Sequence, residues 1–211
     1  MRKFIVGLVG GLVALVGFAG SSSASATIDL IWATSGTATT SILASDTGIV
    51  LEVWITSGAG GIQGAGISVD YSTLCVGCIT SFTNNPSAGA DPMPLVLGST
   101  NDTGSRLENI NAASFAPYVG TGLTAVGQSY LLGTITFGNV GGAGGSFTLT
   151  SDVNGPTDDI LDMGSLVISG TSTFNVGSIN VAAVPEPGTL SLLGMGLGGL
   201  YVVGRRSSRK R

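Results

Sequence analysis

The 211-residue sequence contains no histidine and almost no basic residues away from its two ends. The lack of histidine excludes serine and cysteine hydrolases that use a histidine base, and it excludes histidine-ligated zinc sites. Charged residues make up 9% of the chain, against about a quarter in an average soluble domain. Seven of the eight Lys and Arg residues lie in the first three or the last seven positions, so Arg106 is the one basic residue in between.

The middle of the chain is therefore acidic. Residues 27–183 hold eleven acids and one arginine, a net charge of −10. Nucleic acid is excluded as a partner, because phosphate binding needs clusters of Lys and Arg. A single arginine also leaves little to stabilise an oxyanion or a phosphate. A glycosidase that works with two carboxylates stays open, but acids alone usually lie solvated on loops, and we expect a protein that is not an enzyme.

The N-terminus has the three parts of a secretory signal peptide. Met1-Arg2-Lys3 is the positive start, residues 4–19 are the apolar stretch, and Ala24-Ser25-Ala26 is a small-residue cleavage site. We expect cleavage after Ala26. The alternative, a permanent N-terminal anchor, is disfavoured by the cleavage site.

The C-terminus contains a candidate membrane span. The uncharged run from Pro187 to Gly204 would be about 27 Å long as a helix, which just crosses the hydrocarbon core of a bilayer. Five basic residues follow it and predict that the end of the chain stays in the cytoplasm. We expect a transmembrane helix at about 188–204, and three regions: a signal peptide (1–26), an exported domain (27–183) and a C-terminal signal (184–211).

A proline pair directly before this span is the most specific motif in the chain. Each proline fixes its own φ and pushes the preceding residue into an extended conformation, so Glu186 is held extended between Pro185 and Pro187. The sequence Val184-Pro185-Glu186-Pro187-Gly-Thr, the Gly/Leu-rich span and the basic end together resemble the PEP-CTERM sorting signal of exported bacterial proteins. The resemblance implies recognition by an exosortase, removal of the tail near Pro-Glu-Pro, and a Gram-negative source that makes exopolysaccharide. A plain C-terminal anchor helix is the alternative.

The exported region predicts an all-β fold. Apolar residues alternate with polar ones in short segments that Gly-rich turns separate, and no helical period is sustained. About nine or ten short strands indicate an antiparallel β-sandwich. The expected strands are 28–32, 49–56, 65–71, 78–83, 94–98, 106–112, 130–137, 146–151, 165–169 and 173–181.

Three of these strands carry a second resemblance. Ile49-Val-Leu-Glu-Val-Trp-Ile, Gly64-Ala-Gly-Ile-Ser-Val-Asp-Tyr71 and Leu132-Gly-Thr-Ile-Thr-Phe137 are similar to strands of cohesin-type jelly-roll domains. The resemblance covers most of residues 27–183 and implies a jelly-roll sandwich. It does not establish a dockerin partner, and no binding residue is carried over.

The two cysteines, Cys75 and Cys78, predict a disulfide. A β-turn centred on Val76-Gly77 would bring their Cα atoms within about 7 Å, and an exported protein meets an oxidising compartment. A thioredoxin-type redox site is disfavoured because the pair follows a strand rather than opening a helix. A zinc site would need two more ligands.

One acidic loop is a candidate calcium site. Calcium prefers several oxygen ligands, and residues 151–162 offer five side chains that carry them: Asp152, Asn154, Asp158, Asp159 and Asp162. The spacing departs from an EF-hand loop, because Pro156 and Met163 occupy unsuitable positions. A solvated acidic turn is the default interpretation.

Sugar-binding surfaces usually expose aromatic side chains, and Trp54 and Tyr118 are the two candidates here. Trp54 shares a strand face with Glu52 and Thr56, although packing between the sheets is the favoured explanation for it. We therefore expect an exported surface or matrix protein with a structural or adhesive role. The alternative is a carbohydrate-binding module for exopolysaccharide.

Overall fold

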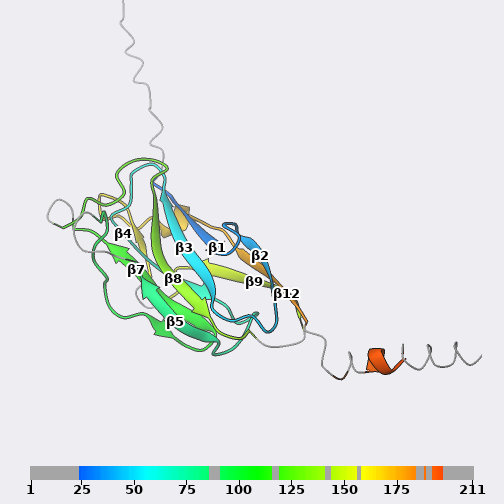
Figure 1. Cartoon of the computed structure of the whole chain (residues 1–211). Coiled ribbons are helices and arrows are strands. Elements are labelled where there is room, and N and C mark those ends of the chain that lie inside the picture. Colours follow the sequence, from blue (N-terminus) through cyan, green and yellow to red (C-terminus); the bar gives the residue numbers. More distant parts are fainter. Residues whose placement is uncertain are drawn as a thin grey trace, which may run out of the picture.

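The computed structural model describes residues 24–85, 91–115, 119–140, 144–155, 158–183, 188 and 192–196. Within them, two β-sheets pack face to face (Figure 1). The strands are β1 (Ala26–Trp32), β2 (Thr39–Leu43), β3 (Ile49–Ser57), β4 (Gly64–Asp70), β5 (Ile79–Asn84), β6 (Asn101–Asp102), β7 (Arg106–Ala113), β8 (Ser129–Phe137), β9 (Gly145–Asp152), β10 (Ile160–Leu161), β11 (Thr173–Phe174) and β12 (Gly177–Ala182). A 3₁₀ turn, η1, covers Ser169–Thr171.

The first sheet has the order β11-β1-β3-β8-β5 and the second the order β2-β12-β9-β4-β7-β6, with β10 paired to β4 beyond the end of β9. Most pairs are antiparallel, which confirms the predicted all-β sandwich. Two pairs, β1 with β11 and β2 with β12, are parallel, which the sequence did not predict.

Strict alternation builds the core. In β1 and β3 every second residue is buried, and the side chains that the sheets enclose include Leu30, Trp32, Leu51 and Val53. Phe137 packs against the ring of Trp32, with centroids 6.0 Å apart, and against that of Tyr71, at 5.8 Å. Each large apolar side chain that is fully buried stabilises the fold by about 1.5–3 kcal/mol. These contacts hold the two sheets together.

Some expected strands are shorter than the sequence indicates. Segment 94–98 has a single bridge, between Leu95 and Ala113, and segment 165–169 has one between Val167 and Leu161. Gly98 and Ser165 have positive φ values of 79° and 63°, so neither continues an extended chain. The expected strand 173–181 is interrupted after Phe174 and yields β11 and β12.

The described domain begins and ends at opposite ends of the sandwich. Ala24 lies at the end where β3 finishes and β4 begins, and Ala183 follows β12 at the other end (Figure 1). Residues 192–196 are helical. In the part of the chain that the structure describes, no helix has the length and apolar character needed to cross a membrane. Most of the expected span 188–204 lies outside the described residues.

Candidate functional site

The acidic side chains of the loop 151–162 bind separate partners in the fold. Asp158 is buried and points inward, where it accepts hydrogen bonds from the Ser68 hydroxyl and the Asn109 amide. Asp159 accepts a hydrogen bond from Ser169 Oγ at 2.8 Å. Asp162 turns back on its own loop and accepts from the amides of residues 164 and 166.

The first two residues of the predicted calcium set are also occupied or exposed. Asp152 is bound by Arg106, and Asn154 is exposed and donates its backbone amide to Asp152 Oδ1 at 2.9 Å. Among the described residues, no three acidic, cysteine or histidine side chains are grouped as a metal site would require. The structure therefore does not bring the five predicted ligands together.

Arg106 is held by two carboxylates. Its guanidinium makes a two-pronged contact with Asp152, one N–O distance being 2.9 Å, and its Nε lies 3.9 Å from Glu108. Partial burial alone would raise the pKa of the Asp152 carboxyl, but the hydrogen bonds and charge of Arg106, together with the hydrogen bonds from Asn154, outweigh it and hold this pKa below its usual value. Arg106, the one arginine of residues 27–183, thus binds carboxylates of its own domain.

Two tyrosines are also tied to carboxylates. Tyr71 donates to Asp102, and Tyr130 donates to Asp91 Oδ2 at 3.1 Å. Burial, together with the neighbouring carboxylate, raises the pKa of both phenols well above the ordinary value. Both hydroxyls therefore stay protonated at neutral pH and serve as hydrogen-bond donors rather than as nucleophiles or bases.

Cys75 and Cys78 form a disulfide, with their Cα atoms 5.9 Å apart. Gly77, between them, has a φ of 66° and donates its amide to Gly104 O at 2.6 Å. The bend that this left-handed residue makes brings the two cysteines to bonding distance.

The outer face of the first sheet carries Trp54. The side chain is half-buried and lies on the face of β3 opposite to Val53 and Ile55, so it does not pack between the sheets. Its Nε1 donates to Glu52 Oε2 at 2.9 Å. A shallow depression of about 330 Å³ surrounds it, lined also by Asp29, Ile31, Gly36, Thr56 and Ser129. Tyr118, the other predicted sugar contact, lies outside the described residues.

The two predicted processing signals adjoin the described domain in the sequence. Ala26 is the first residue of β1 and pairs with Ser57, and the carbonyl of Ala24 accepts from Thr171 Oγ1 at 2.6 Å. Val184, Pro185, Glu186 and Pro187 lie outside the described residues. Because β12 ends at Ala182, this tetrapeptide follows the last strand after the single residue Ala183.

This position is where a known family matches. Residues 183–210 match the family of the PEP-CTERM protein-sorting motif. The chain carries a PEP-CTERM sorting motif. The match begins at the first residue after β12, so the sorting motif is joined directly to the closed sandwich. No curated protein matches the chain in sequence.

Solved structures similar to the sandwich include cohesin domains. CaCohA2 of Clostridium acetobutylicum, in complex with CaDoc0917, gives a TM-score of 0.51 at 14% identity, over 74% of this chain and 99% of that one. A type I cohesin–dockerin complex from Clostridium thermocellum gives 0.50 at 12% identity, over 76% and 94%. The seventh ScaB type I cohesin from Pseudobacteroides cellulosolvens gives 0.50 at 16%, over 78% and 95%. These likenesses confirm the cohesin-like fold.

Proposed function

We propose that this is an exported, exosortase-sorted protein whose sandwich has a structural or adhesive role at the cell surface or in the extracellular matrix. The observation that carries the proposal is the PEP-CTERM motif at residues 183–210, directly behind the last strand of a closed domain. A sorting motif in that place makes the sandwich the cargo that is delivered.

The proposed route has three steps. The N-terminal signal starts export, and it is removed after Ala26. The apolar span at about 188–204 then holds the chain in the inner membrane with the sandwich in the periplasm. An exosortase recognises Val184 to Pro187, where the two prolines present Glu186 in an extended conformation at low ordering cost, and releases the sandwich to the surface.

The contacts of the polar groups support a role without catalysis. Arg106 is neutralised by Asp152 and Glu108, both buried tyrosines are donors, and the cysteines are joined. Within the described residues, these groups are engaged in holding the fold together. A binding or structural role needs only the surface that the sandwich displays.

The mature ends of the protein test the route. The full chain is expressed in its exosortase-containing host and in the same host without the exosortase, and both termini are read by mass spectrometry. We expect Thr27 as the first residue and loss of residues beyond the Pro-Glu-Pro segment where the exosortase is present. The double substitution Pro185→Ala/Pro187→Ala should leave the tail attached, whereas Ser207→Ala/Ser208→Ala, in the same tail, should be processed normally. An intact tail in the complete host contradicts the proposal.

A carbohydrate-binding role is the second candidate, and the outward position of Trp54 favours it. An aromatic face beside the carboxylates of Glu52 and Asp29 offers a stacking surface next to hydrogen-bond acceptors for hydroxyl groups. A glycan array probed with the full chain should show binding that Trp54→Ala removes. Thr134→Ala changes the same strand pair without touching an aromatic and should leave binding unchanged. Binding that survives Trp54→Ala would exclude this face.

A further inference from the structure

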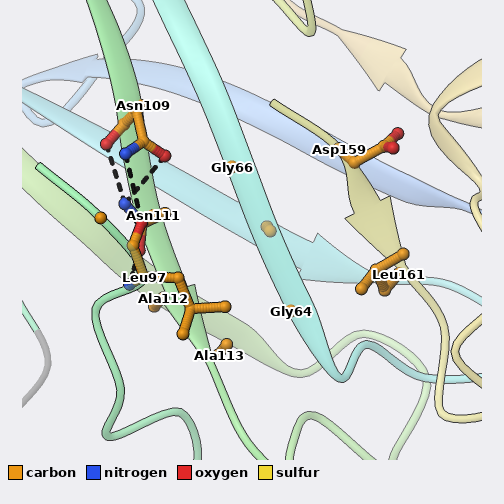
Figure 2. Close-up of a pocket in the computed structure, with 11 residues that line it drawn as sticks. Gly64, Gly66, Leu97, Asn109, Asn111, Ala112, Ala113, Asp159 and Leu161 are labelled. Atoms are coloured by element: carbon orange, nitrogen blue, oxygen red, sulfur yellow. Dashed lines mark hydrogen bonds between the residues drawn. The ribbon is translucent and has the colours of Figure 1, made fainter. Parts of the chain in front are cut away.

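A trough crosses the outer face of the second sheet. It has a volume of about 370 Å³ and lies over the beginning of β4 and the end of β7, with β10 on one side and the segment 95–98 on the other. Figure 2 shows Gly64 and Gly66 between Leu161 and Asp159 on one side and Leu97, Asn111 and Ala113 on the other. The lining is mostly apolar, as binding pockets commonly are.

The trough is open because its floor has almost no side chains. Gly64 pairs with Ala113 on one side and with Leu161 on the other, and Gly66 pairs with Asn111. Neither glycine has a positive φ, so the backbone does not require glycine at these positions. Glycine inside a strand weakens it, and it often marks a place where another molecule approaches the backbone closely. The two glycines keep space free above the sheet, and at Gly64 an added Cβ would already lie 3.3 Å from Ala113 Cβ.

The wall at Leu97 is fixed by an amide network. The Leu97 amide donates to Asn111 Oδ1 at 2.5 Å, and Asn109 Nδ2 donates to the carbonyls of Leu97 at 3.2 Å and of Ser99 at 3.0 Å. Asn109 has a left-handed φ of 59°, which a non-glycine residue adopts at some cost. These bonds hold Leu97, which is 48% exposed, at the rim instead of letting it collapse onto the glycine floor.

The opposite wall is held by strand pairing. The Leu161 carbonyl accepts the Gln63 amide at 2.9 Å, and Val167 forms a bridge with Leu161 on the far side. Val167 is 60% exposed, so the apolar surface continues outward from this wall. With two fixed walls and two strands between them, the outer strands stand about 14 Å apart, and a ligand meets a preformed site.

The charge of the trough points to the chemistry of its partner. Asp159 is the charged residue in the lining, and the hydrogen bond that the structure gives its carboxylate is the one from Ser169 to Oδ1. Arg106, the only basic residue of the exported region, is bound to Asp152 and Glu108. A second copy of the folded domain therefore offers no free cation to this carboxylate. On the proposed route the other Lys and Arg residues of the chain are removed with its two terminal signals, so a different protein is the source of the positive charge.

We propose that the trough binds a lysine or arginine side chain carried on an extended segment of a partner protein. The aliphatic stem lies on Gly64 and Gly66 between Leu97 and Leu161, and the cationic head reaches Asp159. Lys and Arg commonly bury their stems on apolar surface and keep the head beside polar groups, so one side chain satisfies both parts of the trough. The proposal rests on the adhesive role proposed above and names the partner chemistry for it.

The location of the trough suits such contact. β4 begins, and β7 and β10 end, at the end of the sandwich where β1 starts, and Ala183 leaves from the other end (Figure 1). A chain held by its C-terminal tail would present the trough away from the membrane.

The test uses ¹⁵N-labelled full chain in detergent micelles, titrated with the peptide acetyl-Gly-Leu-Lys-Leu-Gly-amide. We expect saturable shifts of the amide signals of Gly64, Gly66 and Leu161. A peptide with norleucine in place of lysine keeps the stem without the charge and should bind at least tenfold more weakly. Gly66→Val fills the floor and should abolish the shifts while the spectrum stays folded. Because the titration needs no exosortase, its failure is distinct from a failure of sorting.

A matched pair of variants tests the contribution of the Asp159 charge to peptide binding. Asp159→Asn should make the lysine and norleucine peptides bind equally, because the charge they distinguish is gone. Asp29→Asn removes the same charge from the other sheet and should preserve the tenfold preference. Equal binding of the two peptides to the unchanged protein overturns the proposal, as does lysine binding that survives Gly66→Val. Shifts of the same amides with a neutral β-glucan tetrasaccharide, and none with the peptide, would assign the trough to a sugar instead.

Discussion

Arg106 of β7 is bound by Asp152 of β9 across the intervening strand β4. The pair is a two-pronged contact between side chains that are 19% and 30% exposed, and it joins residues 46 positions apart in the sequence. It fixes the three strands at the end of the sheet where the acidic loop begins.

Loss of this pair should weaken the fold. Asp152→Asn removes the charge but not the shape and should lower the free energy of unfolding by about 1–3 kcal/mol, the range for hydrogen bonds to charged groups. Urea unfolding followed by fluorescence measures it. Asp46→Asn, which changes a half-buried turn carboxylate bound by the Leu43 amide rather than by a cation, is the control and should cost less. Equal effects of the two changes would show that the ion pair adds nothing.

The same pair predicts the response to acid. Because the pKa of Asp152 is lower in the folded protein than in the unfolded chain, its contribution is complete above the unfolded pKa of about 4 and is lost as the pH falls through the lower, folded value. The stability difference between the original protein and Asp152→Asn should therefore be constant at neutral pH and shrink below about pH 4. Urea midpoints at several pH values check this. A difference that persists at pH 2 contradicts it.

The two tryptophans should differ in their effect on stability. Trp32 is fully buried between the sheets, whereas Trp54 lies on the outer face. Trp32→Ala should cost about 3–5 kcal/mol, as large-to-small core changes do, and Trp54→Ala less than half as much. Thermal melts of both variants compare them directly. A larger loss for Trp54→Ala would place it in the core.

Calcium should leave the melting temperature unchanged. Four of the five candidate oxygen-bearing side chains contact separate protein groups and the fifth, Asn154, is exposed. A ligand raises stability only when it binds the folded state. Melting in 5 mM CaCl₂ should therefore match melting in EDTA within about 1 °C. A calcium-dependent rise that MgCl₂ does not reproduce would restore the loop 151–162 as a calcium site.

The disulfide should be present but modest in effect. The bond closes a loop of only four residues, for which the chain-entropy relation gives at most about 2 kcal/mol. The double change Cys75→Ala/Cys78→Ala should lower the melting temperature by a few degrees without unfolding the protein. Alkylation without prior reduction should leave both cysteines unmodified in the exported protein. Rapid alkylation would show free thiols.

The sequence predicted the strands that alternate cleanly, because one face of each is buried against the other sheet. β3 and β8 are of this kind. β2 was missed because its one buried large apolar residue is Ile42, and its pairing with β12 joins residues far apart in the chain. β10 was missed because two residues inside an acidic loop carry no period.

The candidate sites also depend on contacts between residues far apart in the chain, which the sequence does not show. The sequence showed that five oxygen-bearing side chains lie close together along the chain, but their partners, Ser68, Arg106 and Ser169, come from other parts of the fold. The alternation of residues in β3 predicts that Trp54 and Val53 lie on opposite faces of the strand. It does not show which of the two faces lies on the outside of the sandwich. The trough was invisible in sequence, because its walls are set by the register of β4 with β7 and β10.

The last strand of the sandwich is flanked on both sides. β12 lies between β2 and β9, so β2 finds its neighbour only when residues 177–182 are in place. On the export route proposed above, the chain crosses the membrane from its N-terminus onward, and the early strand β2 waits for nearly the whole domain to cross. On that route, the sandwich is completed only when its C-terminal segment arrives, and the sorting motif follows directly after this segment in the sequence.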